Sequence, residues 1–277
     1  MESAVGGLGY ENEPLICAGW ITAAADNSFK GCFSFTSNAW QTTPYTRTNK
    51  VSQLGSFAFN LDQTGMGRAI AISDRTIDVL NPVSALIPFG WSLSANLEMP
   101  ASSVSGCSVA INASTYFIVH GEQQDGETVS NKTYFLNVET NTLTDGPEIL
   151  VPRFSLQCSK MEESGAVVSS YVVISGGIGQ NAELLNSTEV LDLNTGVWRM
   201  GPEMPVPIRD GVMLEHPALG VIVVGGRTGT SSDFVDLTDI YYLPSLGNSW
   251  FLLPQKLTNA RSRHLTFYVQ ESNTSCA

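Results

Sequence analysis

The side chains that carry most catalytic chemistry are few and scattered in this sequence. Three histidines occur, His120, His216 and His264, and they lie far apart along the chain. A metal site needs imidazole, thiolate or carboxylate groups that converge on one point, and a nucleophile needs an adjacent base. Neither arrangement can be assembled from this spacing. We therefore expect no catalytic residues, no metal site and no cofactor.

Glycine-rich and acidic strings in the C-terminal half do not match known ligand-binding loops. Residues 225–230 are rich in glycine, but the residues after them predict a strand, whereas a phosphate-binding loop leads into a helix. Asp233, Asp236 and Asp239 are three apart, and calcium loops use alternate positions. The nine arginines are spread along the chain, which argues against a group of them that clamps a carboxylate.

The composition excludes several classes of partner. The chain has 277 residues, of which 14% are charged, and 26 acidic residues against 14 basic ones give a net charge of −12. This balance repels nucleic-acid phosphates and anionic lipids, and Lys and Arg form no local cluster. No apolar run approaches the roughly 18 residues that a membrane span needs. We expect one domain, no binding to nucleic acid and no membrane insertion.

A repeat of about 50 residues organises the chain. Five apolar runs end in small or turn-forming residues, and their last positions are 20, 74, 121, 177 and 226. A second series consists of Trp40, Trp91, Leu143, Trp198 and Trp250, which are spaced by 51, 52, 55 and 52 residues. Short β-prone runs with Asn and Gly turns lie between these landmarks. Four short strands per repeat of this length are typical of a propeller blade.

The repeat resembles the kelch motif. In residues 171–209 and 220–263, a strand ends in paired glycines, and a loop, a further strand, a Trp, a proline and an arginine follow. The resemblance covers essentially the whole chain and fades toward the N-terminus, where His120-Gly121, Ser73-Asp74 and Gly19-Trp20 replace the glycine pair. It implies an all-β propeller with the fold that kelch proteins share with galactose oxidase.

The resemblance implies five four-stranded blades in one domain, residues 1–277. The repeats run approximately over residues 1–53, 54–102, 103–152, 153–208 and 209–262, and residues 263–271 form a strand that closes the ring in the first blade. The alternative is an incomplete six-bladed propeller. Arginines before the first strand of a repeat, Arg153, Arg209 and Arg263, are assigned to the architecture. The glycines and tryptophans assigned to it are Gly121, Gly176, Gly177, Gly225, Gly226, Trp40, Trp91, Trp198 and Trp250. Of these, we expect Trp198 and Trp250 to be buried between blades.

Long polar loops follow the glycine strands of repeats three, four and five. Because loops on a rigid scaffold commonly carry binding residues, we expect a non-enzymatic scaffold that binds a protein partner through these loops on one face. Their acidity favours a partner with a basic patch, and the turn at His216 and Pro217 is the next candidate on the same rim. The alternatives are a secreted propeller enzyme or carbohydrate-binding protein with an unrecognised site, and an incomplete copy without activity. The expected partner-binding residues are Glu122, Asp125, Glu127, Asn181, Glu183, Arg227, Asp233 and Asp236.

The cysteines and glycosylation sequons leave two interpretations open. No pair of the five cysteines is spaced C-x-x-C, so the thiols are either buried and free or form disulfides in an extracellular chain. In the second case we expect Cys17 to pair with Cys32 and Cys107 with Cys158, and Cys276 to remain free or to pair outside the chain. Residues 1–9 lack the pattern of a signal peptide, yet secretion is favoured over the cytoplasm. The N-x-S/T acceptors are Asn112, Asn131, Asn186 and Asn273.

Overall fold

The computed structural model describes residues 5–8, 14–20, 28–36, 39–46, 56–61, 67–81, 90–103, 105–121, 128–163, 168–230 and 233–266. Within these ranges the chain forms β-strands, turns and loops, and it forms no helix. A helix with the length and apolar character needed to cross a membrane is accordingly absent from the described part. The fold is all-β, as the sequence predicts.

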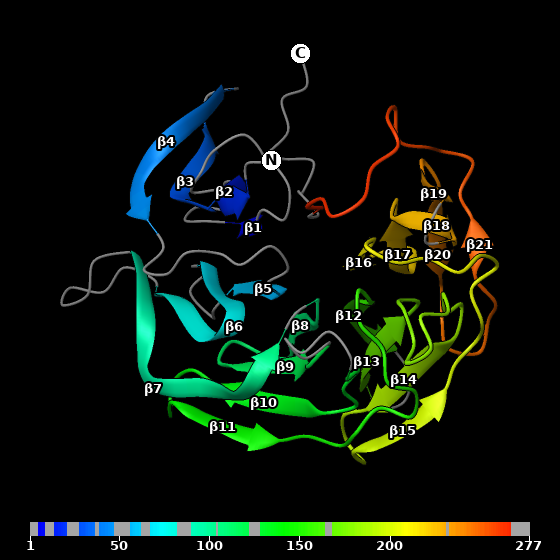
Figure 1. Cartoon of the computed structure of the whole chain (residues 1–277), viewed down its shortest axis with the longest axis horizontal. Coiled ribbons are helices and arrows are strands. Elements are labelled where there is room, and N and C mark those ends of the chain that lie inside the picture. Colours follow the sequence, from blue (N-terminus) through cyan, green and yellow to red (C-terminus); the bar gives the residue numbers. More distant parts are fainter. Residues whose placement is uncertain are drawn as a thin grey trace.

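Five antiparallel sheets follow one another around a common centre (Figure 1). The first strand of each sheet is the innermost, and successive innermost strands contact one another in the order β1, β5, β8, β12 and β16. This arrangement is a β-propeller, and the sheets are its blades one to five. The strands are β1 (Val5–Leu8), β2 (Pro14–Trp20), β3 (Ser28–Thr36) and β4 (Ala39–Thr46) in blade one; β5 (Ser56–Leu61), β6 (Gly67–Asn81) and β7 (Gly90–Ser103) in blade two; β8 (Cys107–Ala110), β9 (Thr115–Val119), β10 (Thr133–Asn137) and β11 (Thr142–Asp145) in blade three; β12 (Gln157–Glu163), β13 (Ser169–Ser175), β14 (Thr188–Asp192) and β15 (Val197–Met200) in blade four; β16 (Val212–His216), β17 (Gly220–Val224), β20 (Ile240–Leu243) and β21 (Phe251–Leu252) in blade five; and β18 (Arg227–Thr230) and β19 (Asp233–Asp236) in a separate hairpin.

The hydrophobic cores lie between neighbouring blades, because the inner strands are buried on both faces. In β9, Tyr116 and Ile118 pack in a cluster shared with blade two, whereas Phe117 and Val119 pack in a cluster shared with blade four. Successive side chains of a strand point to opposite faces, so one unbroken apolar run serves two cores. A third cluster joins blades four and five in the same way.

The paired glycines end the second strand of blades four and five by adopting left-handed backbone conformations. Gly176 and Gly177 have φ values of 61° and 90°, and Gly225 and Gly226 have values of 58° and 95°. Residues with a Cβ rarely adopt these conformations. A Cβ on Gly177 would also lie 2.6 Å from the carbonyl oxygen of Phe154. The architectural role predicted for these glycines agrees with this geometry. Gly121 of blade three also has a positive φ, of 137°.

Blade two departs from the predicted four strands, and its missing glycine pair explains the difference. Ser73 and Asp74 stand at that position, and β6 continues through them to Asn81 instead of ending there. β7 pairs along this extension, from Asn81 opposite Gly90 to Asp74 opposite Ser103. The described part of blade two consequently has three strands, of which β6 and β7 are long.

Two of the repeat tryptophans are buried between blades, as predicted. The side chain of Trp198 is 7% exposed and its Nε1 donates a hydrogen bond to the carbonyl oxygen of Pro147 in the preceding blade, at 2.8 Å. Trp250 is 4% exposed and donates in the same way to Pro202, at 3.0 Å. The Gly-Pro-Glu segment of one blade thus supplies the acceptor that the indole of the next blade needs.

Trp40, which the repeat assigns to the architecture, is not buried between blades. Its side chain is 47% exposed and packs against Phe35 of its own hairpin, with ring centroids 5.3 Å apart. The reason lies in the direction of packing, since Trp198 and Trp250 are covered by the blade that precedes theirs. No blade precedes the first one among the described residues. The side chain of Trp91 lies outside them.

A series of backbone hydrogen bonds links equivalent residues just before the innermost strands of blades three, four and five and at Arg263 in the segment after blade five. Ser105, Ser155, Asp210 and Arg263 have φ values of 55°, 53°, 56° and 51°, and we call them the entry residues. The N–H of Ser155 donates to the carbonyl of Ser105 at 2.7 Å, that of Asp210 to Ser155 at 3.0 Å, and that of Arg263 to Asp210 at 2.8 Å. Blade four is therefore tied to blade three, blade five to blade four, and the segment at Arg263 to blade five, at equivalent residues.

The tail does not take the innermost place in blade one in the part that the structure describes. β1 holds this place and pairs with β2, from Val5 opposite Cys17 to Leu8 opposite Pro14. Residues 264–266 form no strand, and residues 267–271 lie outside the described ranges. The N-terminal segment thus occupies the position that the sequence analysis assigned to the tail. The repeat boundaries and a role of the tail in closing the ring stay predictions.

Candidate functional site

The loops after the glycine strands leave blades four and five at the same edge as the entry residues. In blade four, Gln157 at the start of β12 lies opposite Ser175 at the end of β13, and blade five has the same register. Residues 176–187 and 225–239 therefore project from one edge of the propeller, which we call the loop rim.

The loop rim contains every predicted partner-binding residue that the structure describes. Four of them are exposed and Arg227 is partly buried. These residues are Asn181, Glu183, Arg227, Asp233 and Asp236. The others, Glu122, Asp125 and Glu127, lie outside the described residues.

The turn at His216 and Pro217 was expected on the same rim, and this expectation is wrong. His216 pairs with Gly220 at the far end of β16 and β17. The turn between these strands therefore lies at the opposite edge of the blade. Antiparallel pairing explains the correction, because a turn between two strands and the loop that follows the second strand must lie at opposite edges.

The loop after β13 is held in place by its own polar groups and by the neighbouring blade. The carboxylate of Glu183 accepts a hydrogen bond from the backbone N–H of Asn181 at 2.8 Å. The side-chain oxygen of Gln180 accepts one from the N–H of Val129, at 3.2 Å, in blade three. The rim of blades three and four is thus joined by a direct contact.

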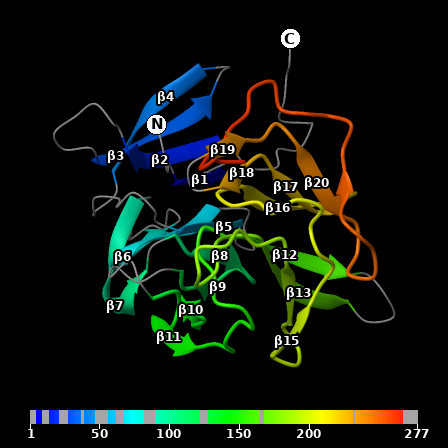
Figure 2. The same ribbon diagram turned by 45° about the vertical axis from the view of Figure 1, so that its right-hand side comes forward.

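The segment after β17 was predicted as a polar loop, and it forms the β18–β19 hairpin instead. The hairpin lies beside β17 in both views (Figures 1 and 2). All four residues of β19 are exposed, and they include Phe234 at 36% and Val235 at 54% exposure. Arg227 pairs with Asp236, with 3.1 Å between Nε and Oδ1. One of the predicted acidic residues is thereby neutralised within the hairpin.

Three arginines converge on the rim of blade five, which the sequence analysis did not predict. Arg209 and Arg263 approach the same carboxylate oxygen of Asp210, with Nε–Oδ2 distances of 3.5 and 3.4 Å. The guanidinium carbon of Arg209 lies 3.8 Å from the ring centroid of Phe234, and that of Arg227 lies 5.8 Å from it. We call Arg209, Arg227 and Arg263 the arginine cluster.

Arg153 has a different environment, although the sequence analysis assigned it the same role. It is fully buried and forms an ion pair with Glu189 at 2.6 Å. Its other guanidinium donors bind the carbonyl oxygens of Gly176, Ser187 and Val151 and the hydroxyl of Ser187. This arginine therefore stabilises blade four and is structural, as predicted.

The three arginines that precede the apolar runs do not occupy equivalent positions in the structure. Arg153 lies two residues before an entry residue, Arg209 lies one residue before an entry residue, and Arg263 is itself an entry residue. Their side chains consequently leave the backbone at three different places. The feature that distinguishes their positions is the left-handed conformation of the entry residue. The entry residues are of different types, so the sequence does not reveal where this conformation occurs.

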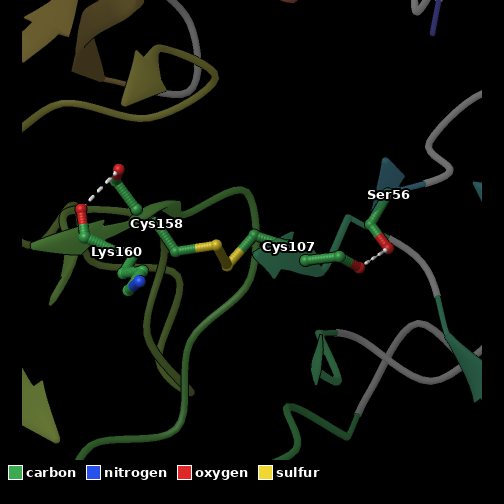
Figure 3. The surroundings of a disulfide bond; sticks show 6 residues. Ser56, Cys107, Cys158 and Lys160 are labelled. Atoms are coloured by element: carbon green, nitrogen blue, oxygen red, sulfur yellow. Dashed lines mark hydrogen bonds between the residues drawn. A yellow bond between two sulfur atoms is a disulfide. The ribbon is translucent and has the colours of Figure 1, made fainter. Parts of the chain in front are cut away.

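The innermost strands of blades two, three and four are joined by side chains. Cys107 of β8 and Cys158 of β12 form the predicted disulfide, with Cα atoms 6.1 Å apart (Figure 3). This distance is within the usual range for such a bridge. On the other side of β8, the hydroxyls of Ser108 and Ser56 are 2.7 Å apart.

The predicted Cys17–Cys32 pair has partial support from the structure. Cys32 is disulfide-bonded, and Cys17 lies opposite it in the ladder between β2 and β3. The side chain of Cys17 lies outside the described residues, as does Cys276. Their pairing stays a prediction.

The glycosylation acceptors differ in how far their side chains are engaged. Asn131 donates a hydrogen bond from its side-chain amide to Glu148 at 2.7 Å, and Asn186 donates to Glu203 at 3.4 Å. The side-chain amide nitrogen of Asn112 makes no such bond among the described residues, and this residue is exposed at the turn after β8. Asn273 lies outside the described part, and modification of all four residues stays a prediction.

The described residues hold no group of three or more His, Cys, Asp or Glu side chains placed to bind a metal ion. His120 is buried, and burial lowers its pKa. Burial and the nearby charge of Arg261 lower the pKa of His264 to about 4. What the rim does offer is exposed apolar surface on one hairpin and concentrated positive charge beside it.

Comparison with known proteins supports the architecture. The kelch motif matches residues 164–205. Kelch-like protein 38 of Homo sapiens is 25% identical over 165 residues, which are 58% of this chain and 26% of that protein. The chain thus spans about a quarter of the length of this curated relative. The solved structure of YjhT matches with a TM-score of 0.66 and 12% identity, over 91% of this chain and 83% of that chain.

The blades and the rim define the general class of the protein as an all-β propeller that presents loops at one edge. The chain is a β-propeller, and residues 164–205 in its fourth blade match the kelch motif.

Proposed function

We propose that the protein is a scaffold that binds a protein partner through the loop rim of blades three to five. The β18–β19 hairpin carries this proposal, because Phe234 and Val235 are exposed on it. Burial of exposed apolar side chains by a partner is favourable in free energy, and aromatic residues are enriched in such contacts. The kelch motif and the similarity to Kelch-like protein 38 support a scaffold role at a general level.

The charge of the rim favours a partner whose contact surface is mixed. Glu183 and Asp233 are exposed acids and suit basic residues of a partner, as the sequence analysis expects. The arginine cluster adds positive charge beside them, so the rim is not uniformly acidic. Charge complementarity of this kind would steer association and fix the orientation of the complex more than it would add affinity.

Photo-crosslinking from the two rims tests the proposal. A photoreactive phenylalanine analogue is placed at Val235 on the loop rim or at Ala218, which is exposed in the turn at the opposite edge. We expect Val235 to crosslink a defined protein that Ala218 does not, and this protein is then purified.

The affinity for the purified protein is measured for Val235→Asp and for the matched control Ala218→Asp. We expect Val235→Asp to weaken binding by at least about tenfold, because it places a charge in an apolar contact, and Ala218→Asp to bind as the parent does. Both substitutions are at exposed positions, and thermal unfolding should be nearly unchanged. Equal crosslinking from the two rims, or full binding by Val235→Asp, would contradict the proposal.

A further inference from the structure

The hydrogen bonds of the arginine cluster are incomplete. The side chain of Arg209 is only 12% exposed and that of Arg263 is 33% exposed. Neither guanidinium group makes a hydrogen bond among the described residues, and Nε of both is buried without one. Arg153 shows the contrast, since its completely buried guanidinium makes five hydrogen bonds.

The charges of the cluster are also unbalanced. Asp236 is paired with Arg227, which leaves the single carboxylate of Asp210 for Arg209 and Arg263 together. Oδ2 of Asp210 lies between their Nε atoms without a hydrogen bond to either. Burial lowers the pKa of Arg209, and the charges of Arg227 and Arg263 lower it further against the opposing effect of Asp210. Among the described residues, one positive charge therefore remains without a counter-ion at a partly buried place, which is unfavourable unless an anion binds there.

The shape of the cluster selects the class of anion. A guanidinium group presents donors in a planar fork that matches the two oxygens of a carboxylate. The ring of Phe234 lies against Arg209 and offers an apolar surface for the carbon atoms that carry such a group. A singly charged organic acid would balance the remaining charge, whereas a doubly charged anion would exceed it.

We propose that Arg209 and Arg263 bind a carboxylate group at the loop rim, beside Phe234. If the proposed function holds, this group belongs to an aspartate or glutamate of the protein partner. A small organic acid would offer the same chemistry. The assignment of the carboxylate to a protein partner rests on the proposed function. The carboxylate site itself is inferred from the arginine cluster alone.

Titration of the full chain with sodium acetate, in exchange for sodium chloride at constant ionic strength, tests the site. The signals of the arginine Nε–Hε groups are followed by nuclear magnetic resonance. We expect those of Arg209 and Arg263 to shift with a common saturating curve, and that of Arg199, which is exposed on β15, to remain unchanged. Shifts that do not saturate, or that are equal for Arg199, would overturn the proposal.

Variants separate a binding site from general positive charge. Arg209→Gln and Arg263→Gln should each weaken acetate binding by at least about tenfold, because charge-assisted bonds are lost, and Arg199→Gln should leave it unchanged. Asp210→Asn removes the competing internal carboxylate, and we expect it to tighten binding. Asn tolerates the left-handed backbone at this position, so the fold should persist. Unchanged or weaker binding in a folded Asp210→Asn variant would count against the proposal.

A second probe distinguishes the sources of the carboxylate. If a protein segment is the ligand, an acetylated and amidated peptide that carries a single glutamate should bind more tightly than acetate and shift the signals of β19 as well. Binding of acetate without such a gain supports the site and identifies a small acid as its ligand. Val235→Asp should keep acetate binding in either case. A failure of the proposed function therefore shows in the crosslinking experiment, and a failure of the carboxylate site shows in the acetate titration.

Discussion

Arg153 and Arg209 precede the inner strands of consecutive blades, yet their guanidinium groups have opposite surroundings. The donors of Arg153 are all used inside blade four, and its charge is matched by Glu189, which also accepts hydrogen bonds from the N–H groups of Leu150 and Val151. The Nε of Arg209 instead lies 3.5 Å from Oδ2 of Asp210, and Arg263 approaches the same oxygen. Residue type alone therefore does not separate a structural arginine from one that is available to a ligand.

Arg153→Met tests the structural role of the buried ion pair. The substitution leaves Glu189 charged and buried without its partner, which typically costs 3–5 kcal/mol, and we expect a loss of about that size in the free energy of unfolding. Arg199→Met in the exposed part of the same blade is the control and should change stability by less than about 0.5 kcal/mol. Urea unfolding measures both. A loss of less than about 1 kcal/mol for Arg153→Met would show that the pair contributes little to stability.

His264 should make stability depend on pH. Its pKa is lowered to about 4 in the folded chain, from an ordinary value near 6.5. Between these values the unfolded chain binds a proton that the folded chain does not, so the stability that neutral His264 contributes is present above about pH 6.5 and is lost as the pH falls toward 4. We expect the Tm to fall over this range, and to fall less in His264→Gln. Part of the dependence should persist because burial also lowers the pKa of His120. Identical pH profiles for the variant and the parent would refute this assignment.

At the scale of elements, the tryptophan and the Gly-Pro-Glu segment form one joint between successive blades. Trp198→Ala and Trp250→Ala each remove a buried indole and leave a carbonyl oxygen without its donor. We expect each to lower the free energy of unfolding by about 3–5 kcal/mol. Trp40→Ala removes the same side chain where it is 47% exposed and should cost less than about 1 kcal/mol. Equal losses in denaturant unfolding of the three variants would show that the joint has no special role.

The positions of the strands could be predicted from the sequence only in part. Where a glycine pair is present, the strand ends as predicted, and where Ser73 and Asp74 replace it, β6 runs on. The hairpin was missed because glycine and serine around residues 225–232 indicate a loop, while the β-prone residues of β18 and β19 form runs too short to predict strands. In the structure these two short runs pair with each other, and Arg227 lies opposite Asp236 at the end of the hairpin.

At the scale of the whole molecule, the disulfide fastens two blades at their innermost strands. Cys107 and Cys158 are 51 residues apart in sequence, so the bridge restricts a long loop of the unfolded chain. We expect Cys107→Ser with Cys158→Ser to lower the free energy of unfolding by about 2–4 kcal/mol. Reduction of the parent should produce a similar loss. Peptide mapping that finds both thiols free in the purified chain, together with no effect of a reductant, would contradict this prediction.

The ring also explains why the arginine cluster could not be predicted from the sequence. The number of blades and most of their strands follow from landmarks that recur in the sequence, because each blade is built largely from local contacts. The cluster instead combines the entry to blade five, the hairpin and a residue that follows the last strand. Arg263 lies 53 residues after Asp210 and reaches it only because successive repeats turn around one centre. A search for short motifs does not detect such a site.

The hydrogen bonds between entry residues have a direction that bears on how the chain is made. In each of them the acceptor belongs to the earlier repeat and the donor to the later one. During synthesis from the N-terminus, repeats four and five and the segment at Arg263 therefore each emerge after the carbonyl that accepts their entry-residue hydrogen bond. Domains and repeats tend to fold in the order in which they emerge from the ribosome. These three bonds favour docking of each of the later repeats on the one made before it.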